Sequence, residues 1–182
     1  MRARLALAAA LVAAAVLGLL ALPSPAVAVP QAQTTRVAED AALVPRIVAA
    51  INAERRGRGL RPLRISGQLA AAAERHARSM ANLGFFAHES ADGTSFARRI
   101  LRSYKVTGYS SWTVGENLLW RSPGVTAGEA LAMWMASPPH RRVLLTGAFR
   151  EIGISVVHAE DAPAAFRNLD VAIVVADFGV RR

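Results

Sequence analysis

The amino-acid sequence predicts an α+β domain with an antiparallel sheet. Apolar residues recur at spacings of three and four over 43–51, which is typical of a helix with one buried face. They alternate over 151–158 and run almost without interruption over 171–176, as strands do. Helical patterns therefore come mainly first and strand patterns last. A polar segment at 160–170 joins the two last strands as a hairpin loop, which favours antiparallel pairing over a doubly wound parallel sheet.

The first 28 residues have the three parts of a secretory signal peptide. Two arginines lie within residues 1–4, an apolar run covers 5–22, and the small-residue triplet Ala26-Val27-Ala28 follows a Pro-Ser-Pro break. We expect cleavage after Ala28 and a secreted, extracytoplasmic protein. The alternative is an uncleaved anchor, because eighteen apolar residues can cross a bilayer core. The sequence has no cysteine, which excludes a lipid-modified cysteine and any disulfide.

Residues 29–38 are rich in Pro, Gln and Thr and predict a flexible linker, so the domain is expected over 39–182. Within it, the first helix is expected over 39–56 and ends at Gly57. Ser66 is an N-cap for a second helix to residue 83, and a shorter helix covers 95–103. A fourth helix begins at Thr126, where Glu129 completes a capping box. A further strand is expected over 113–120.

The charge of the chain is basic, and almost all of it comes from arginine. Residues 1–28 hold two of the 22 basic residues and none of the 13 acidic ones, so the remaining chain carries a net charge of +7. Such a surface attracts anionic wall polymers or lipid headgroups, although solvated arginines without a partner are the simpler interpretation. The densest run, over 55–64, is interrupted by glycine and proline and contains no aromatic residue. Specific nucleic-acid binding is therefore not expected.

Three residues in different segments could share a polar site. His88 lies in a loop between two helices, His140 follows two prolines that we expect to end the fourth helix, and Glu116 precedes an apolar run. Two imidazoles and one carboxylate can hold Zn²⁺ with an open fourth position. No short metal motif joins them, so a polar cluster that only ties loops together is an alternative. His76 lies on an apolar helix face, where a hydrogen-bonded core role is expected.

The order of motifs along the chain resembles the bacterial branch of the CAP superfamily, also called SCP-like, PR-1-like, allergen V5/Tpx-1-related or YkwD-like. The similarity covers about 43–179. The matching stretches are Ile51-Asn52-Ala53-Glu54-Arg55, Gly84-Phe85-Phe86-Ala87-His88, Gly115-Glu116-Asn117-Leu118, Trp134-Met135-Ala136-Ser137-Pro138-Pro139-His140-Arg141, Glu151-Ile152-Gly153-Ile154 and Asp177-Phe178-Gly179.

The resemblance implies a three-layer α-β-α sandwich with a central antiparallel sheet and a cleft lined by histidines and acidic groups. The positions that match the cleft residues are His88, Glu116 and His140. Some relatives have a second glutamate where this chain has Ser137, so the full set of four is not present. The bacterial branch also usually has asparagine at the position of Val143.

Three functions remain open on the sequence. The first is a secreted module that depends on a divalent metal, Zn²⁺ foremost, held by His88, Glu116 and His140, or that binds a lipid, a cell-wall polymer or a protein in the cleft. The second is a metal-assisted hydrolase of a wall or peptide substrate. The third is a purely structural polar cluster. No catalytic activity follows from the residues, and binding without catalysis is preferred.

Overall fold

The computed structural model describes residues 35–182. These residues belong to one compact unit that has hydrophobic clusters of its own. The predicted signal peptide at 1–28, and residues 29–34 of the predicted linker, lie outside the described residues. None of the helices in the described part of the chain combines the length and the apolar run that crossing a bilayer requires.

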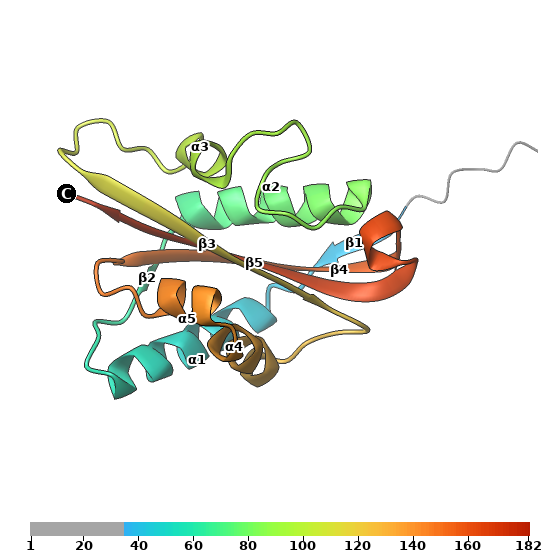
Figure 1. The fold of residues 1–182 in the computed structure, drawn as a ribbon, viewed down its shortest axis with the longest axis horizontal. Coiled ribbons are helices and arrows are strands. Elements are labelled where there is room, and N and C mark those ends of the chain that lie inside the picture. Colours follow the sequence, from blue (N-terminus) through green and yellow to red (C-terminus); the bar gives the residue numbers. More distant parts are fainter. Residues whose placement is uncertain (1–34) are drawn as a thin grey trace, which may run out of the picture. The chain divides into compact units, whose positions relative to one another are not determined.

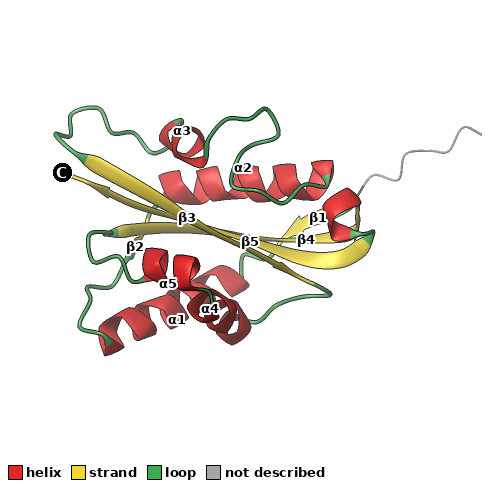
Figure 2. Cartoon of the chain, viewed as in Figure 1, coloured by secondary structure: helices red, strands yellow, loops and turns green. Residues whose placement is uncertain are grey.

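Helices cover both faces of one sheet, as the α-β-α prediction requires (Figure 1; Figure 2). The strands are β1 (Val37–Glu39), β2 (Arg64–Ile65), β3 (Trp112–Arg121), β4 (Glu151–Ala162) and β5 (Leu169–Arg181). Their order is β1-β4-β5-β3; all these neighbours are antiparallel, and only the short β2 joins β4 in parallel. The helices are α1 (Leu43–Gly57), α2 (Gly67–Leu83), α3 (Phe96–Leu101), α4 (Ala127–Ala136) and α5 (Pro138–Leu144), with a 3₁₀ turn at Ala164–Phe166.

Alternation along the strands separates two cores. On the face covered by α1, α4 and α5, every second residue of β5 from Val174 to Val180 packs with Trp134 of α4. On the face covered by α2, the intervening residues Ile173 and Val175 pack with Met80. The central sheet is therefore buried on both faces, which explains why β5 is almost continuously apolar in sequence.

Three predicted helix starts are confirmed by their caps. The side chain of Ser66 accepts from the backbone N–H of Leu69, and Ser95 does the same for Arg98. Thr126 and Glu129 form the reciprocal capping box. Each cap satisfies an N–H group that has no partner within its own helix.

The predicted start of the first helix was wrong. Val37–Glu39 forms β1, which pairs with β4, so residues 37–38 belong to the sheet and not to a linker. The helix begins later, at Leu43, whose N–H donates to Asp40 Oδ1. Strand β4 is longer than predicted, and its edge at Val157, His158 and Ala159 gives β1 a partner.

The prediction that Pro138 and Pro139 end the fourth helix is confirmed, since α4 ends at Ala136. The same two prolines are also the first residues of a further helix, α5, which carries His140 and which was not predicted. Proline suits this position because the first N–H groups of a helix have no intrahelical acceptor and because its φ is already helical. His140 is consequently held by a helix and not by a flexible segment.

Candidate functional site

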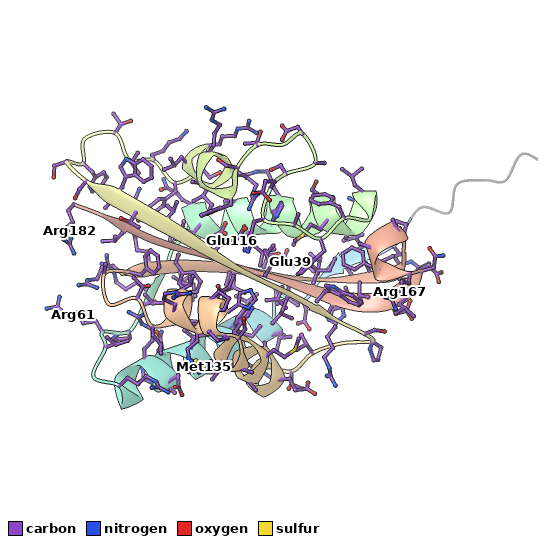
Figure 3. All side chains as sticks on the ribbon, in the orientation of Figure 1. Glu39, Arg61, Glu116, Met135, Arg167 and Arg182 are labelled. Atoms are coloured by element: carbon purple, nitrogen blue, oxygen red, sulfur yellow. The ribbon has the colours of Figure 1, made fainter. Side chains whose placement is uncertain are left out.

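Glu116, which is labelled in Figure 3, is the centre of a buried polar network that joins β3 to α3 and to the loop before α3. It lies in β3 with a fully buried side chain. Its Oε1 is 2.7 Å from His88 Nδ1, and its Oε2 accepts a hydrogen bond from Arg99 Nη2. Arg99 also donates through Nη1 to the His88 carbonyl at 2.7 Å. One guanidinium thus neutralises the carboxylate and holds the loop that carries the histidine.

The two candidate histidines have pKa values displaced in opposite directions. The hydrogen bond that the His88 ring donates to Glu116 raises the pKa of His88, against a smaller opposing effect of burial. Burial lowers the pKa of His140, and the charge of His88 adds to that effect. Around neutral pH, His88 therefore carries more positive charge than His140 does. His88 is half-exposed, so this charge faces solvent-accessible space.

Asp177 extends the network below the surface. It lies opposite Glu116 in the β3–β5 register and is completely buried. Among the described residues, neither of its carboxylate oxygens has a hydrogen-bond partner. Burial first, and then the nearby charge of Glu116, raises the pKa of Asp177 well above its usual value. A neutral Asp177 can donate its proton to Glu116, which removes the conflict between the two carboxylates.

His140 reaches β3 from the opposite face of the sheet. Asn117 Nδ2, one residue after Glu116, donates to the His140 carbonyl at 3.0 Å. Successive residues of a strand point to opposite faces, so Glu116 and Asn117 fix the two histidines from the two sides of β3. Three distant segments thus contact this strand, but His88 contacts Glu116 through its side chain whereas His140 contacts Asn117 through its backbone carbonyl.

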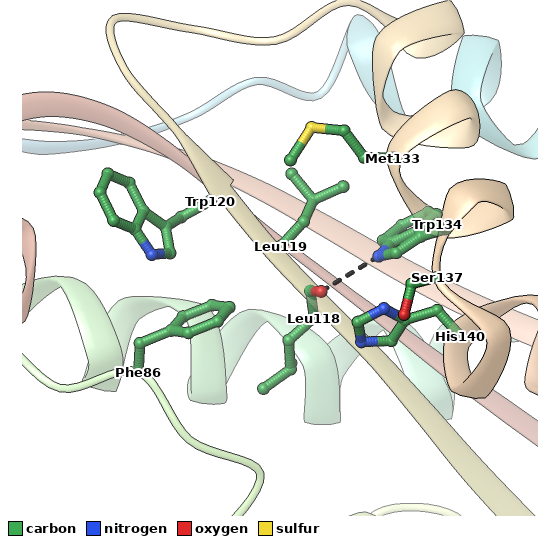
Figure 4. A pocket seen from close by; sticks show the side chains of 8 residues that line it. All are labelled: Phe86, Leu118, Leu119, Trp120, Met133, Trp134, Ser137 and His140. Atoms are coloured by element: carbon green, nitrogen blue, oxygen red, sulfur yellow. Dashed lines mark hydrogen bonds between the residues drawn. The ribbon is translucent and has the colours of Figure 1, made fainter.

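A pocket of about 270 Å³ opens where α4 and α5 pass the edge of β3 (Figure 4). Its lining is mainly apolar, and the polar side chains are those of His140 and Ser137 on one side. The lining residues are Phe86, Leu118, Leu119, Trp120, Met133, Trp134, Ser137 and His140. Trp134 Nε1 donates to the Leu118 carbonyl at 3.1 Å, which fixes one wall of the pocket to the strand.

The sequence-predicted site residues therefore fall into two adjoining groups. His88 and Glu116 belong to the polar network, whereas His140 and Ser137 line the pocket. Sequence reasoning missed Arg99 and Asp177. Asp177 lay within a recognised motif, but Arg99 carried no signal because it is one of several arginines in and around α3. His76 is buried and its Nε2 lies 2.9 Å from the Ala87 carbonyl, which confirms its core role.

The arrangement does not suit Glu116 as a metal ligand. Both its oxygens are engaged, one by His88 and the other by the cationic Arg99, which would repel a divalent ion. Within residues 35–182 no group of three or more histidine and acidic side chains is arranged to hold a metal. His88 Nε2 and the ring of His140 are the donors that remain for such an ion.

Comparisons of the sequence and the structure with known proteins agree on one family. Residues 48–178 match the model of the cysteine-rich secretory protein family, CAP. The Bacillus subtilis protein YkwD is 32% identical over 115 residues, which is 63% of this chain and 42% of YkwD. The chain thus spans less than half the length of that relative.

Solved structures show the same fold at lower identity. An outer surface protein from Borrelia burgdorferi superposes with a TM-score of 0.66 at 20% identity, covering 81% of this chain and 99% of that one. An extracellular protein containing a SCP domain from Bacillus anthracis gives a TM-score of 0.59 at 22% identity, covering 78% of this chain and 41% of the other. Since both identities are low, these likenesses concern the fold alone.

Proposed function

Because this chain belongs to the CAP family, we propose that it is an exported binding protein whose pocket at the edge of β3 takes a small amphiphile with an apolar body and an acidic group. The observation that carries this proposal is the juxtaposition of a mainly apolar pocket with two histidines that flank the same strand. Ligand sites typically combine an apolar lining with a few polar groups that fix orientation.

The size and lining of the pocket favour a short apolar body. A water molecule occupies about 30 Å³ in the liquid. At that volume for each heavy atom, the pocket of about 270 Å³ holds about nine heavy atoms. The rings of Phe86, Trp120 and Trp134 offer flat apolar walls, and Met133 offers a wall that adapts its shape. A medium-length alkyl chain or a single ring system meets both conditions.

The charge around the pocket favours an acidic group at its polar end. His140 lies in the lining, and the raised pKa of His88 supplies positive charge close to it. Arg99 already neutralises Glu116, so that carboxylate does not repel an anion strongly. An acidic ligand is thus attracted from solvent and held with its polar end towards the histidines.

The metal-dependent and hydrolytic alternatives have less support. Both carboxylate oxygens of Glu116 are already bound, one by Arg99 and one by His88. A metal would therefore be held by His88 and His140 without a carboxylate. Hydrolysis needs a nucleophile paired with a base, and Ser137 beside His140 is the pair that the pocket offers. In the described residues no hydrogen bond joins these two side chains, and a binding role remains the better supported one.

Octanoate and octanol provide a direct test, because they share an apolar chain and differ in charge. The protein lacking residues 1–28 keeps the whole compact unit and can be titrated with each while tryptophan fluorescence is followed. Trp120 and Trp134 line the pocket, so occupancy should change their emission. We expect saturable binding of octanoate that is several-fold tighter than that of octanol.

A pocket-blocking variant supplies the control for location. Ser137 makes no side-chain capping bond at the start of α5, so Ser137→Phe can fill the pocket without removing a cap. The matched variant Ile65→Phe places the same ring on an exposed strand residue that does not line the pocket. Loss of octanoate binding in Ser137→Phe alone supports the proposal. Unchanged binding in Ser137→Phe, or equal affinity for octanol, contradicts it.

A further inference from the structure

Six exposed basic and aromatic residues lie on α2, on or just after α3 and in the segment that leads to β3. These elements lie on the other side of the sheet from α1, α4 and α5 (Figure 1). The six residues are Arg75, Arg98, Arg102, Lys105, Tyr109 and Trp112, here called the basic–aromatic surface. This surface shares no residue with the pocket at β3. It therefore requires an explanation of its own.

Several contacts hold the basic–aromatic surface together. Arg75 of α2 donates to the Ser103 hydroxyl at the end of α3, and Lys105 Nζ donates to the Arg102 carbonyl at 2.9 Å. The guanidinium of Arg181, in β5, donates to the Lys105 carbonyl and stacks over the Tyr109 ring at 5.1 Å. Trp112 is the direct cross-strand partner of Arg181. The loop 102–112 is thus fixed against the sheet with its bases and rings exposed.

The bases of this surface are not held in salt bridges, although the charge of Arg102 acts on the nearby carboxylate of Asp92. The sequence from residue 93 to residue 115 contains four basic residues and no aspartate or glutamate. One of the four, Arg99, is buried against Glu116, and the other three are exposed. The bases of the surface itself are Arg75, Arg98, Arg102 and Lys105. Within residues 35–182, no ion pair joins any of these four to a carboxylate. Glu151, on the neighbouring strand, is already occupied by Tyr104 and Arg181.

We propose that the basic–aromatic surface docks on the anionic headgroups of a lipid bilayer. Its charge is complementary to phosphate-bearing headgroups, each of which can accept from arginine or lysine. Tyr109 and Trp112 are 45% and 44% exposed, and amphipathic rings of this kind favour the headgroup level of a membrane. A soluble polyanion would use the bases but would gain little from two exposed rings, so the lipid surface is the better match.

Sedimentation with vesicles tests this docking on the protein lacking residues 1–28, which removes the apolar segment that would bind lipid by itself. We expect partitioning onto vesicles of equal parts phosphatidylcholine and phosphatidylglycerol, and none onto phosphatidylcholine alone. A base near an anionic surface is worth about fivefold in partitioning, so Arg98→Gln/Arg102→Gln/Lys105→Gln should lose about a hundredfold. Trp112→Thr should weaken partitioning and abolish a blue shift of tryptophan emission.

The chain offers a control of identical charge. Arg56→Gln/Arg61→Gln/Arg64→Gln removes three exposed arginines near the end of α1 and β2, where no aromatic residue accompanies them. This variant should keep most of its partitioning. Equal loss in both triple variants would mean attraction by net charge alone and would overturn the proposal. The proposal would also be overturned if the protein bound soluble polyglycerol phosphate but did not bind the anionic vesicles.

Discussion

Glu116 and Asp177 face each other across β3 and β5, and neither Asp177 oxygen receives a hydrogen bond from any described residue. Two ionised carboxylates in this buried place would repel each other. A single proton on Asp177 turns the repulsion into a hydrogen bond to Glu116, and Arg99 then balances the one remaining charge. The stability of the fold should therefore depend on the protonation of this buried pair, which lies next to the half-exposed His88.

Asp177→Asn should make the protein more stable than the wild type at high pH. Burial raises the pKa of Asp177, so the folded state holds a proton that the unfolded state releases from about pH 4 upward. The stability that depends on this proton is complete below the unfolded pKa and falls as pH rises through the folded pKa. Asparagine keeps a donor towards Glu116 without titrating. Urea unfolding between about pH 4 and about pH 8 measures the difference in slope.

The exposed Asp92 gives a control of opposite sign. The backbone N–H of Thr94 lowers the pKa of Asp92, so its contribution is present above the unfolded pKa and is lost as pH falls. Asp92→Asn should therefore lose stability towards neutral pH, where Asp177→Asn gains it. An Asp177→Asn protein with the wild-type slope would show that this carboxyl is ionised in the fold.

Arg99→Met should destabilise the protein by about 3 to 5 kcal/mol, the usual result of leaving a buried charge without its partner. The variant removes the cation from Glu116 and also releases the His88 carbonyl. Arg99→Met/Glu116→Gln should recover part of the loss, because no buried charge is then uncompensated. Guanidinium unfolding of the two single variants and the double variant measures the coupling. A coupling near zero would contradict the ion pair.

The sequence predicted the fold better than the site. The helix caps at Ser66 and Thr126 and the apolar patterns of the strands are local signals, and the structure confirms them. The strand at 37–39 has no local signal, since its reason for being extended is the edge of β4, more than a hundred residues away. Pro138 and Pro139 correctly indicated the end of α4, but α5 was missed because proline can follow one helix and also begin another.

Arg99 shows why the electrostatics of the site escaped prediction. Arg98 and Arg102 are exposed on or beside the same short helix, and nothing in their order marks the middle arginine as buried. Only the approach of α3 to β3 brings it to Glu116. The family resemblance supplied His88, Glu116 and His140, but the partner that decides what Glu116 can do comes from a contact between distant segments.

Zinc should leave the stability of the wild-type protein nearly unchanged. Glu116 is held by Arg99 and His88, so a metal would have to displace a buried ion pair before it gained this carboxylate. A site filled at a hundredfold excess over its Kd would stabilise the fold by about 2.7 kcal/mol, which thermal unfolding detects easily. A stabilisation of that size that disappears in His88→Ala/His140→Ala would establish the metal site and contradict this expectation.

Arg55→Ala should cost about 3 kcal/mol of stability, from three lost hydrogen bonds of about 1 kcal/mol each. The Arg55 side chain is fully buried and donates to the carbonyls of Arg61, Leu144 and Thr146. It thereby fixes the end of α1 to the end of α5. Arg56→Ala, one residue on, removes an exposed side chain and should change stability by less than about 0.5 kcal/mol. Similar losses in the two variants would contradict the assigned role.

Gly153→Ala should be among the most damaging single substitutions, because α2 packs directly against the backbone of β4 at this residue. A Cβ at residue 153 would lie 2.0 Å from the Ala70 nitrogen and 2.2 Å from the Leu69 carbonyl carbon, so the helix would have to move off the sheet. We expect a loss of about 3 kcal/mol or more, measured by urea unfolding. Gly128→Ala is the matched control, because a Cβ there meets no atom within 4 Å. Alanine restricts the conformations of the unfolded chain, so this variant should be more stable by as much as about 1 kcal/mol. A mild effect at Gly153 would mean that α2 is not pressed against β4, and the polar network beneath α2 would then be open to water.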